Sequence, residues 1–294
     1  MDLPTITSVV AARSRADLAT VGPGTAVLAG GTWLYSVPQP DLTGLVDLMT
    51  LGWPALEVSS DGLVVAAICT VGELGALPAA DVPADWRAHP LLRRCARSLL
   101  ASPKVQRVAT VGGNICCALP AGAMTSLAVA LEGTALVWTP DGGERRVRVA
   151  DLVVGDAVTT LAPGEVLRAV ELPASALRSR TASRRVSLSR TGRTAAMVVG
   201  RVPAEESEGA LVVSLTASVP RPVVLRFDVA PSAGELAAAV EGVAEGRADG
   251  GARVEPAEPV PWFDDVHGFP DWRRAMTLRL AEQVRAELAA PAPP

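Results

Sequence analysis

Two glycine-rich segments contain the residues whose types and spacing point most clearly to chemistry. The first glycine segment is Leu28-Ala29-Gly30-Gly31-Thr32-Trp33-Leu34, and the second is Thr110-Val111-Gly112-Gly113-Asn114. A Gly pair lets backbone approach a ligand closely, because no Cβ intervenes and a positive φ costs little. Successive N–H groups in such turns suit phosphate oxygens, and the two Thr hydroxyls can add to them. Together the segments predict two walls around one pyrophosphate, as a dinucleotide would require.

Neither glycine segment matches an established phosphate motif. No Gly-Lys-Ser/Thr follows, as a Walker loop would need, and the spacing is not Gly-x-Gly-x-x-Gly. The alternative is that both Gly pairs form ordinary turns, since the chain contains 26 Gly. If the ligand interpretation is right, Val at Gly31 or Gly113 should abolish binding, because its Cβ would occupy the pyrophosphate site.

The other reactive side chains are few. Cys69, Cys95, Cys116 and Cys117 match neither zinc nor iron–sulfur spacings. We interpret them as buried free thiols. The alternative is that Cys116 or Cys117 lines a ligand pocket, since both directly follow the second glycine segment. The chain has only two His, so the sequence predicts no metal site and identifies no catalytic residue.

Length and composition restrict the class of protein. The 294 residues suffice for one large domain or two ordinary ones with a sizeable core. The net charge of −4 argues against nucleic acid or an acidic membrane surface as a partner. No apolar run has the length of a membrane span, and the first residues do not resemble a signal peptide. We therefore expect a cytoplasmic protein without nucleic-acid or membrane partners.

Short apolar runs alternate with amphipathic segments, which predicts a mixed α+β fold. The hairpin signal Asp61-Gly62 precedes an apolar run, and Pro90 suits the first turn of a helix. The expected helices span 4–22, 89–101, 124–132, 232–245 and the C-terminal stretch from Pro270 to Leu288. The expected strands span 26–29, 45–48, 63–67, 135–139, 145–149, 195–202 and 210–219, with one more within 161–173.

A change in composition near 174–183 predicts a domain boundary. The stretch that follows is locally basic. Its simplest interpretation is a solvated linker and edge strand, and the alternatives are a contact with an anionic cofactor or a partner surface. The basic residues are Arg178, Arg180, Arg184, Arg185, Arg190 and Arg193.

Over nearly its whole length the chain resembles the FAD-binding medium subunit of the molybdenum hydroxylases, the carbon monoxide dehydrogenase and xanthine dehydrogenase family. The most specific stretch is Ser102–Asn114, which is similar to that family's second FAD loop, and Val27–Thr32 is similar to the first. Weaker similarity lies at Ala67–Leu74, Leu161–Val166 and Asp271–Met276.

The resemblance implies a fold and a domain organisation. A PCMH-type, vanillyl-alcohol-oxidase-like FAD-binding domain is expected over 1–174, with subdomains of about 1–55 and 56–174. A smaller C-terminal α+β domain over 175–290 would cover the flavin, and 291–294 would form a frayed tail. The two glycine segments would hold the FAD pyrophosphate.

The chain also departs from the family pattern. Ala123 stands where the family usually has Asp, and the stretch Ser183-Arg184-Arg185-Val186 lacks the family Lys near the flavin. Val186 replaces that Lys in our alignment, and Arg184 or Arg185 would then supply the charge. We include Arg185 among the expected cofactor contacts.

The resemblance implies an FAD-dependent dehydrogenase subunit that passes electrons between an iron–sulfur partner and a soluble acceptor. The substrate would react at a molybdopterin subunit. The sequence leaves open whether the electron acceptor is NAD or another small molecule. A stand-alone flavin oxidoreductase that acts directly on a metabolite is one alternative, with Trp33, Tyr35, Cys116 and Cys117 lining its pocket. A flavin-free scaffold of the same fold is the other.

Overall fold

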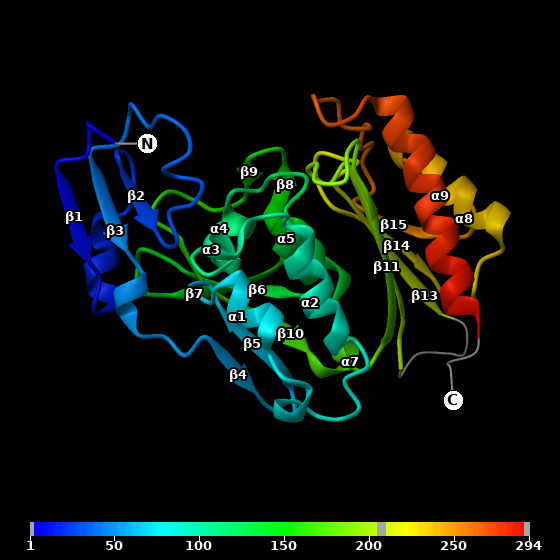
Figure 1. The fold of residues 1–294 in the computed structure, drawn as a ribbon, viewed down its shortest axis with the longest axis horizontal. Helices are drawn as coiled ribbons and strands as arrows, with labels where there is room; N and C mark the ends of the chain where they lie inside the picture. The colour runs from blue at the N-terminus through cyan, green and yellow to red at the C-terminus, as the bar shows by residue number, and fades with distance from the viewer. Residues whose placement is uncertain (1–2, 205–209, 291–294) are drawn as a thin grey trace.

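The computed structural model describes residues 3–204 and 210–290, and strands and helices are mixed throughout them (Figure 1). The described strands form one three-stranded, two five-stranded and one two-stranded sheet. The α+β fold class is confirmed. The frayed tail expected at 291–294 lies outside the described residues.

The N-terminal sheet is parallel and ends at the first glycine segment. Its order is β1-β3-β2, formed by β1 (Ser8–Ala11), β3 (Gly44–Asp47) and β2 (Thr25–Leu28). The helix expected over 4–22 is wrong. The β-branched Val9 and Val10 pair with β3, and a capping box of Ser14 with Asp17 begins a separate 3₁₀ turn at Arg15–Thr20.

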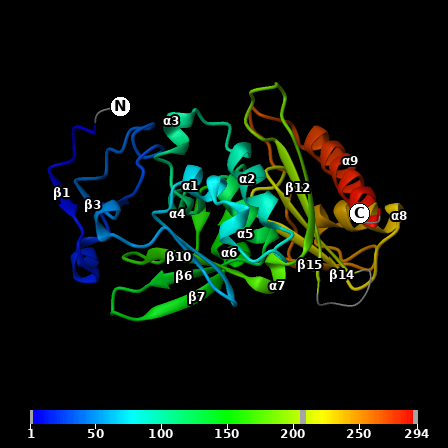
Figure 2. The ribbon, with the colours of Figure 1, turned by 60° about the horizontal axis from the view of Figure 1, so that its bottom comes forward.

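The central sheet is antiparallel and supports most of the helices. Its order is β4-β5-β10-β6-β7, and Figure 2 shows α1, α4 and α5 above β10, β6 and β7. The strands are β4 (Leu56–Val58), β5 (Gly62–Ala66), β6 (Thr134–Trp138), β7 (Glu144–Arg148) and β10 (Val166–Pro173). The hairpins expected at Asp61-Gly62 and between 135–139 and 145–149 are confirmed as β4–β5 and β6–β7.

The helices over the central sheet pack their apolar residues against it and form a shared core. The amphipathic segment at 89–101 forms α2 (His89–Ser98), with Pro90 in the first turn. Thr70 caps α1 (Val71–Ala76) through a capping box with Glu73. The remaining elements here are α3 (Pro103–Gln106), α4 (Val111–Cys116), α5 (Ala123–Ala130), α6 (Val149–Leu152), α7 (Ala174–Leu177), β8 (Val153–Gly155) and β9 (Val158–Thr159).

The C-terminal sheet has helices on both faces (Figure 1). One face shares a core with α5 and α2 through residues such as Met197 and Val212, and the other packs on α8 and α9 through Val198 and Val213. All residues of β13 are buried, and four of its six residues are apolar, as expected for a strand covered on both faces. The elements are β11 (Arg180–Val186), β12 (Ala196–Val202), β13 (Leu211–Thr216), β14 (Val223–Phe227), β15 (Arg253–Glu255), α8 (Ala233–Gly242) and α9 (Pro270–Ala289).

Polar contacts attach the C-terminal sheet to the central helices. Glu132 follows α5 and accepts hydrogen bonds from Arg201 at 2.6 Å and Arg226 at 2.7 Å. The Ser126 hydroxyl lies 2.7 Å from that of Thr216. The chain passes from the central to the C-terminal sheet between β10 and β11, and the domain division at 174/175 stays a prediction. Within the described ranges no helix combines the length and apolar character needed to cross a bilayer.

Candidate functional site

The first glycine segment leaves a run of backbone donors unused. It directly follows β2, and Gly31 adopts a φ of +66° that favours glycine. Among the described residues, no acceptor receives a hydrogen bond from the amides of Gly30 to Leu34. The next amide, that of Tyr35, donates to the Gly31 carbonyl at 2.9 Å. The segment therefore offers several unpaired N–H groups within one turn, as we expected.

The second glycine segment is different, because it begins a helix. Thr110 caps α4, and its Oγ1 accepts a hydrogen bond from Gly113 N at 3.1 Å. Val111 N donates to Cys69 O at 2.8 Å and Gly112 N to Ala67 O at 2.9 Å. Asn114 N donates to Thr110 O at 3.0 Å. The expectation of free amides in this segment is therefore wrong.

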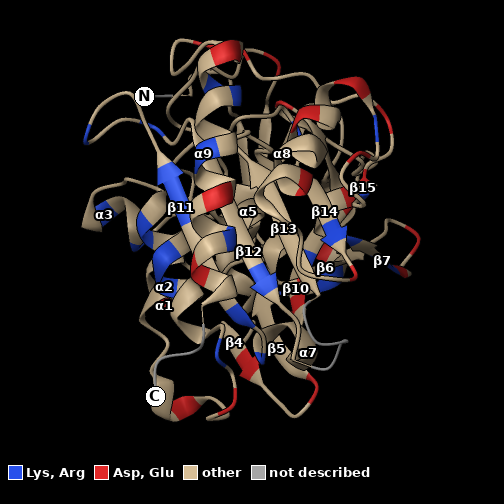
Figure 3. Cartoon of the chain, turned by 90° about the vertical axis from the view of Figure 1, so that its right-hand side faces the viewer, with Lys and Arg blue, Asp and Glu red and all other residues tan. Residues whose placement is uncertain are grey.

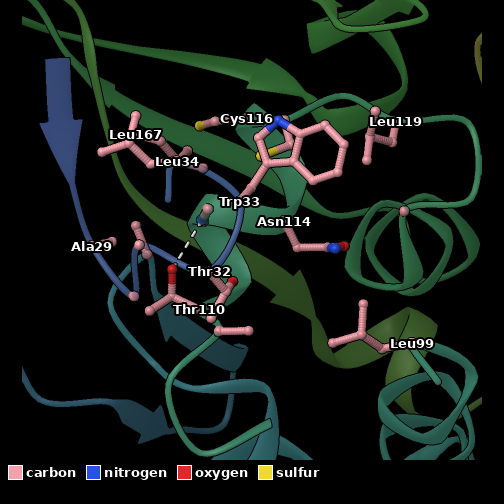
Figure 4. A pocket seen from close by; sticks show the side chains of 18 of the residues that line it. Ala29, Thr32, Trp33, Leu34, Leu99, Thr110, Asn114, Cys116, Leu119 and Leu167 are labelled. Atoms are coloured by element: carbon pink, nitrogen blue, oxygen red, sulfur yellow. Dashed lines mark hydrogen bonds between the residues drawn. The ribbon is translucent and has the colours of Figure 1, made fainter. Parts of the chain in front are cut away.

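Side chains supply the polar groups of the second glycine segment instead. The Asn114 Oδ1 accepts from Met124 N at 2.8 Å, which leaves the Nδ2 group of Asn114 available as a donor. The Thr110 hydroxyl accepts from Gly113 and keeps its own hydrogen for a further acceptor. Figure 4 shows Thr110 and Asn114 on the cavity wall close to Thr32 and Trp33.

An added Cβ on any of the four motif glycines would come closer than 3.0 Å to another protein atom, on Gly113 to the Thr110 Oγ1 at 2.8 Å. A Cβ on Gly30 would stand 1.8 Å from Val108 O, and one on Gly112 would stand 2.8 Å from the Ala67 Cα. A Cβ on Gly31 would meet the Tyr35 ring at 2.6 Å. Gly30 thus brings the first glycine segment against the backbone just before the second. The expectation that a Val at Gly31 acts through the ligand alone is wrong, because its Cβ would meet the Tyr35 ring as well.

The two glycine segments face one cavity of about 740 Å³, which lies within the range of about 300–1,000 Å³ typical of ligand pockets. Its lining is mostly apolar and comes from the N-terminal sheet, from the central sheet and its helices, and from the loop between β11 and β12. The expected site residues that line it are Leu28, Ala29, Gly30, Gly31, Thr32, Trp33, Leu34, Thr110, Gly112, Gly113 and Asn114.

Two expected site residues do not line the cavity. Val111 is buried in the core beneath it. Arg185 points to the polar groups behind the wall: its Nη1 donates to Thr194 Oγ1 at 2.7 Å and to Ser98 O at 3.4 Å. Burial lowers the pKa of Arg185. Arg184 is further away and pairs with Glu287 on α9.

Sequence reasoning missed a large part of the lining. These residues lie at the end of α2 and just after it, between α4 and α5, between β8 and β9, and on β10. Apolar residues of this kind have no sequence signal for ligand binding, because only the folded chain brings them together around the cavity. The residues to which sequence reasoning gave no ligand role include Ser98, Leu99, Leu100, Leu119, Ala121, Gly122, Ala157 and Leu167.

The cavity contains one carboxylate, and it is already paired. Arg145 donates to both oxygens of Glu165, at 2.7 and 2.6 Å, and Ala162 N donates to the same carboxylate at 2.8 Å. These hydrogen bonds, above all those from Arg145, hold the pKa of Glu165 below its ordinary value. Glu165 is thus a charge-balanced acceptor and a poor general base.

The cysteines separate into two pairs. Cys69 and Cys95 are buried free thiols, as expected, and burial raises the pKa of each to about 12. Cys116 and Cys117 line the cavity, in agreement with the alternative. Burial raises the pKa of Cys117 to about 11, so this thiol stays protonated at neutral pH and is a weak nucleophile.

A second, smaller cavity of about 150 Å³ adjoins the first. The two share Leu119, Ala121, Arg193 and Thr194 as lining. The rest of its wall is more polar and comes from the loop before α9 and its surroundings, namely Pro120, Asp156, Ala217, Phe263, Asp265 and Arg273.

Residues 6–175 match the family described as the FAD binding domain in molybdopterin dehydrogenase. The chain belongs to this family. FAD is its cofactor, and the resemblance that we derived from the glycine segments and their neighbours is confirmed. The match includes both glycine segments and every lining residue of the main cavity except Thr191, Arg193 and Thr194.

Individual proteins that are similar to this chain in sequence or structure are consistent with this family assignment. The carbon monoxide dehydrogenase medium chain of Afipia carboxidovorans is 29% identical over 163 residues, which span 53% of this chain and 53% of the relative. The quinoline 2-oxidoreductase structure from Pseudomonas putida 86 has a TM-score of 0.75 at 22% identity, covering 99% of this chain and 100% of that one. The CO dehydrogenase structure from Oligotropha carboxidovorans has a TM-score of 0.77 at 20% identity, covering 97% and 99%. The structural matches extend the similarity in fold to the C-terminal sheet.

The residues of the main cavity fit the cofactor of this family. Unpaired amides at Gly30 to Leu34 suit the pyrophosphate oxygens, and apolar walls suit aromatic rings. Ala123, in place of the usual family Asp, is fully buried at the start of α5 and adds no polar group.

Proposed function

We propose that the chain binds FAD in the main cavity and passes electrons between an iron–sulfur partner and a soluble acceptor, within a molybdenum-hydroxylase-type complex. The observation that carries this proposal is the run of unpaired amides at Gly30 to Leu34 on the wall of a cavity of about 740 Å³. Membership of the FAD-binding family supports it, as does similarity to a carbon monoxide dehydrogenase medium chain.

The residues of this chain bind and orient the cofactor. The amides of Gly30 to Leu34 and the Thr32 hydroxyl donate to the pyrophosphate, and Thr110 and Asn114 donate from the opposite wall. When bound, the flavin supplies the redox chemistry. The FAD-binding unit is 1–174, and residues 175–290 close the cavity through the loop that carries Arg193 and Thr194.

The composition of the cavity favours electron transfer over direct oxidation of a metabolite. Proton abstraction from a substrate needs a titratable group with a suitable pKa within hydrogen-bond reach. The described lining contains no His or Asp, and Glu165 is bound by Arg145. Electron transfer requires no such base.

The first test is a visible spectrum of the purified protein, with chromatography of the released chromophore. We expect flavin bands and FAD. The second test is affinity purification from the native host, in which we expect iron–sulfur and molybdopterin subunits to accompany the chain.

The two alternatives give different results. A yellow protein without partners, whose flavin is bleached by a small metabolite alone, would identify a stand-alone oxidoreductase. A colourless protein that takes up no added FAD would contradict the proposal and leave the scaffold.

A further inference from the structure

The lining of the main cavity contains one charged side chain without a partner. Glu165 and Arg193 are the charged residues among those that line it, and Glu165 is neutralised by Arg145. The Arg193 guanidinium makes no hydrogen bond or ion pair with any described residue, and its side chain is exposed. An unpaired cation in a pocket for an anionic cofactor points to a contact with that cofactor.

The two residues that follow Arg193 are held in place by buried contacts. The hydroxyl of Thr194, which is only 4% exposed, accepts a hydrogen bond from Arg185. Buried Arg273 donates to Ala195 O. These contacts fix the chain just after Arg193, while the Arg193 side chain is exposed and has no partner among the described residues.

Basic residues accompany this loop in the sequence, but they have other roles. Figure 3 shows blue on β11, the strand that leads into this loop. Arg184 pairs with Glu287, and Arg185 supports Thr194. The positive charge that we expected from Arg184 or Arg185 is therefore supplied to the cavity from the β11–β12 loop, by Arg193.

Two observations indicate which part of the cofactor Arg193 faces. The first glycine segment already provides unpaired donors for the pyrophosphate. Arg193 instead stands where the main cavity meets the second cavity. A redox cofactor must present its ring to a reaction partner, and the second cavity provides space beside Arg193 for such a contact, whereas the pyrophosphate already has donors in the first glycine segment.

We propose that Arg193 lies against the flavin ring and stabilises the negative charge that the ring acquires on reduction, an inference that rests on the function proposed above. A flavin that accepts two electrons and one proton keeps one negative charge on its pyrimidine portion. A nearby cation favours that form and raises the reduction potential. Arg193 thus tunes the reduction potential of the flavin.

The test compares Arg193→Ala and Arg193→Lys with Arg190→Ala, a control on the same exposed loop that does not line the cavity. The midpoint potential of the bound flavin is measured in a dye-coupled titration of the holoprotein, and the Kd for FAD separately. For Arg193→Ala we expect about a tenfold loss in stabilisation of the reduced form, which lowers the potential by about 30 mV. Arg193→Lys should retain most of the potential, and Arg190→Ala all of it.

Other outcomes would overturn the inference. If Arg193→Ala weakened FAD binding severalfold while the potential of the bound flavin stayed unchanged, Arg193 would contact the pyrophosphate. If neither quantity changed, Arg193 would have no role toward the cofactor. A wild-type protein that takes up no FAD would refute the proposed function as well, and the wild-type spectrum alone identifies that case.

Discussion

At the scale of single residues, the site depends on glycines that serve chain packing as much as ligand approach. Gly30 has the Val108 carbonyl where its Cβ would be, at 1.8 Å. This contact joins the N-terminal sheet to the backbone that leads into α4. A side chain at position 30 would therefore separate the two cavity walls, although it need not touch the ligand.

We predict that Gly30→Ala weakens FAD binding at least a hundredfold and lowers the Tm, because the new Cβ cannot coexist with Val108 O. Calorimetric titration of the apoprotein with FAD and a thermal melt measure both effects. Gly234→Ala is the matched control: its Cβ would have nothing within 4 Å and it lies in α8, where Ala should stabilise by about 0.5–1 kcal/mol. Unchanged FAD affinity in Gly30→Ala would contradict the packing role.

The sequence pattern could identify these glycines, but not their partners. Val108 lies far from Gly30 in the chain, and only the fold brings them together. Arg185, which we expected to contact the cofactor, does not line the cavity. On a strand, neighbouring side chains alternate between faces, and the cation that reaches the cavity comes from the following loop at Arg193.

At the scale of elements, local sequence patterns predicted most helices and strands. They failed where long-range backbone hydrogen bonds determine whether a segment is a helix, a strand or a loop. The second glycine segment was expected to be a loop, because Gly disfavours helices. It forms the start of α4 because Thr110 caps it and because Cys69 and Ala67 carbonyls accept its first amides. The β-branched run at 8–11 needed β3 as a partner to become a strand.

The loop between β11 and β12 depends on an arginine of α9. Arg273 is 1% exposed and donates to Gly268 O, Ala195 O and Ala217 O and to the Asp265 carboxylate. Lysine cannot reproduce this planar set of donors, and it would leave buried carbonyls unpaired.

We predict that Arg273→Lys lowers the free energy of unfolding by about 3 kcal/mol, since several charge-assisted bonds are lost. Urea denaturation measures it. The neighbouring Arg274→Lys is the control, because Arg274 is exposed and pairs with Glu241 on the surface, a contact worth about 0–1 kcal/mol. Equal effects of the two variants would show that the buried network does not stabilise the loop.

At the scale of the whole molecule, the C-terminal sheet is attached to the rest through Glu132. Burial alone would raise the pKa of the Glu132 carboxyl, but the interactions with Arg201 and Arg226 lower it by more than burial raises it. The pKa of Glu132 is therefore below its ordinary value of 4.5. A depressed carboxyl pKa adds stability above the unfolded value, and this stability is lost as the pH falls through the folded value. The contact should therefore weaken only in acid below about pH 4.5.

We predict that Glu132→Gln destabilises the protein by about 2 kcal/mol at pH 7, because Arg201, 2% exposed, loses its charged acceptor. The difference from wild type should shrink as the pH falls below 4.5. Chemical denaturation over a pH series measures both. The control Glu171→Gln removes a more exposed pair with Arg146, for which about 0–1 kcal/mol is expected. A difference that persists unchanged in acid would contradict the charge-based explanation.

The unequal use of backbone amides in the two glycine segments has a consequence for assembly. The amides of Val111 to Asn114 are bonded within the protein itself, so that wall forms as the chain folds. Those of Gly30 to Leu34 have no acceptor among the described residues, and under the proposed function the pyrophosphate supplies it. The wall formed by α4 would then be complete in the apoprotein, whereas the hydrogen bonds of the first glycine segment would form only when FAD is loaded.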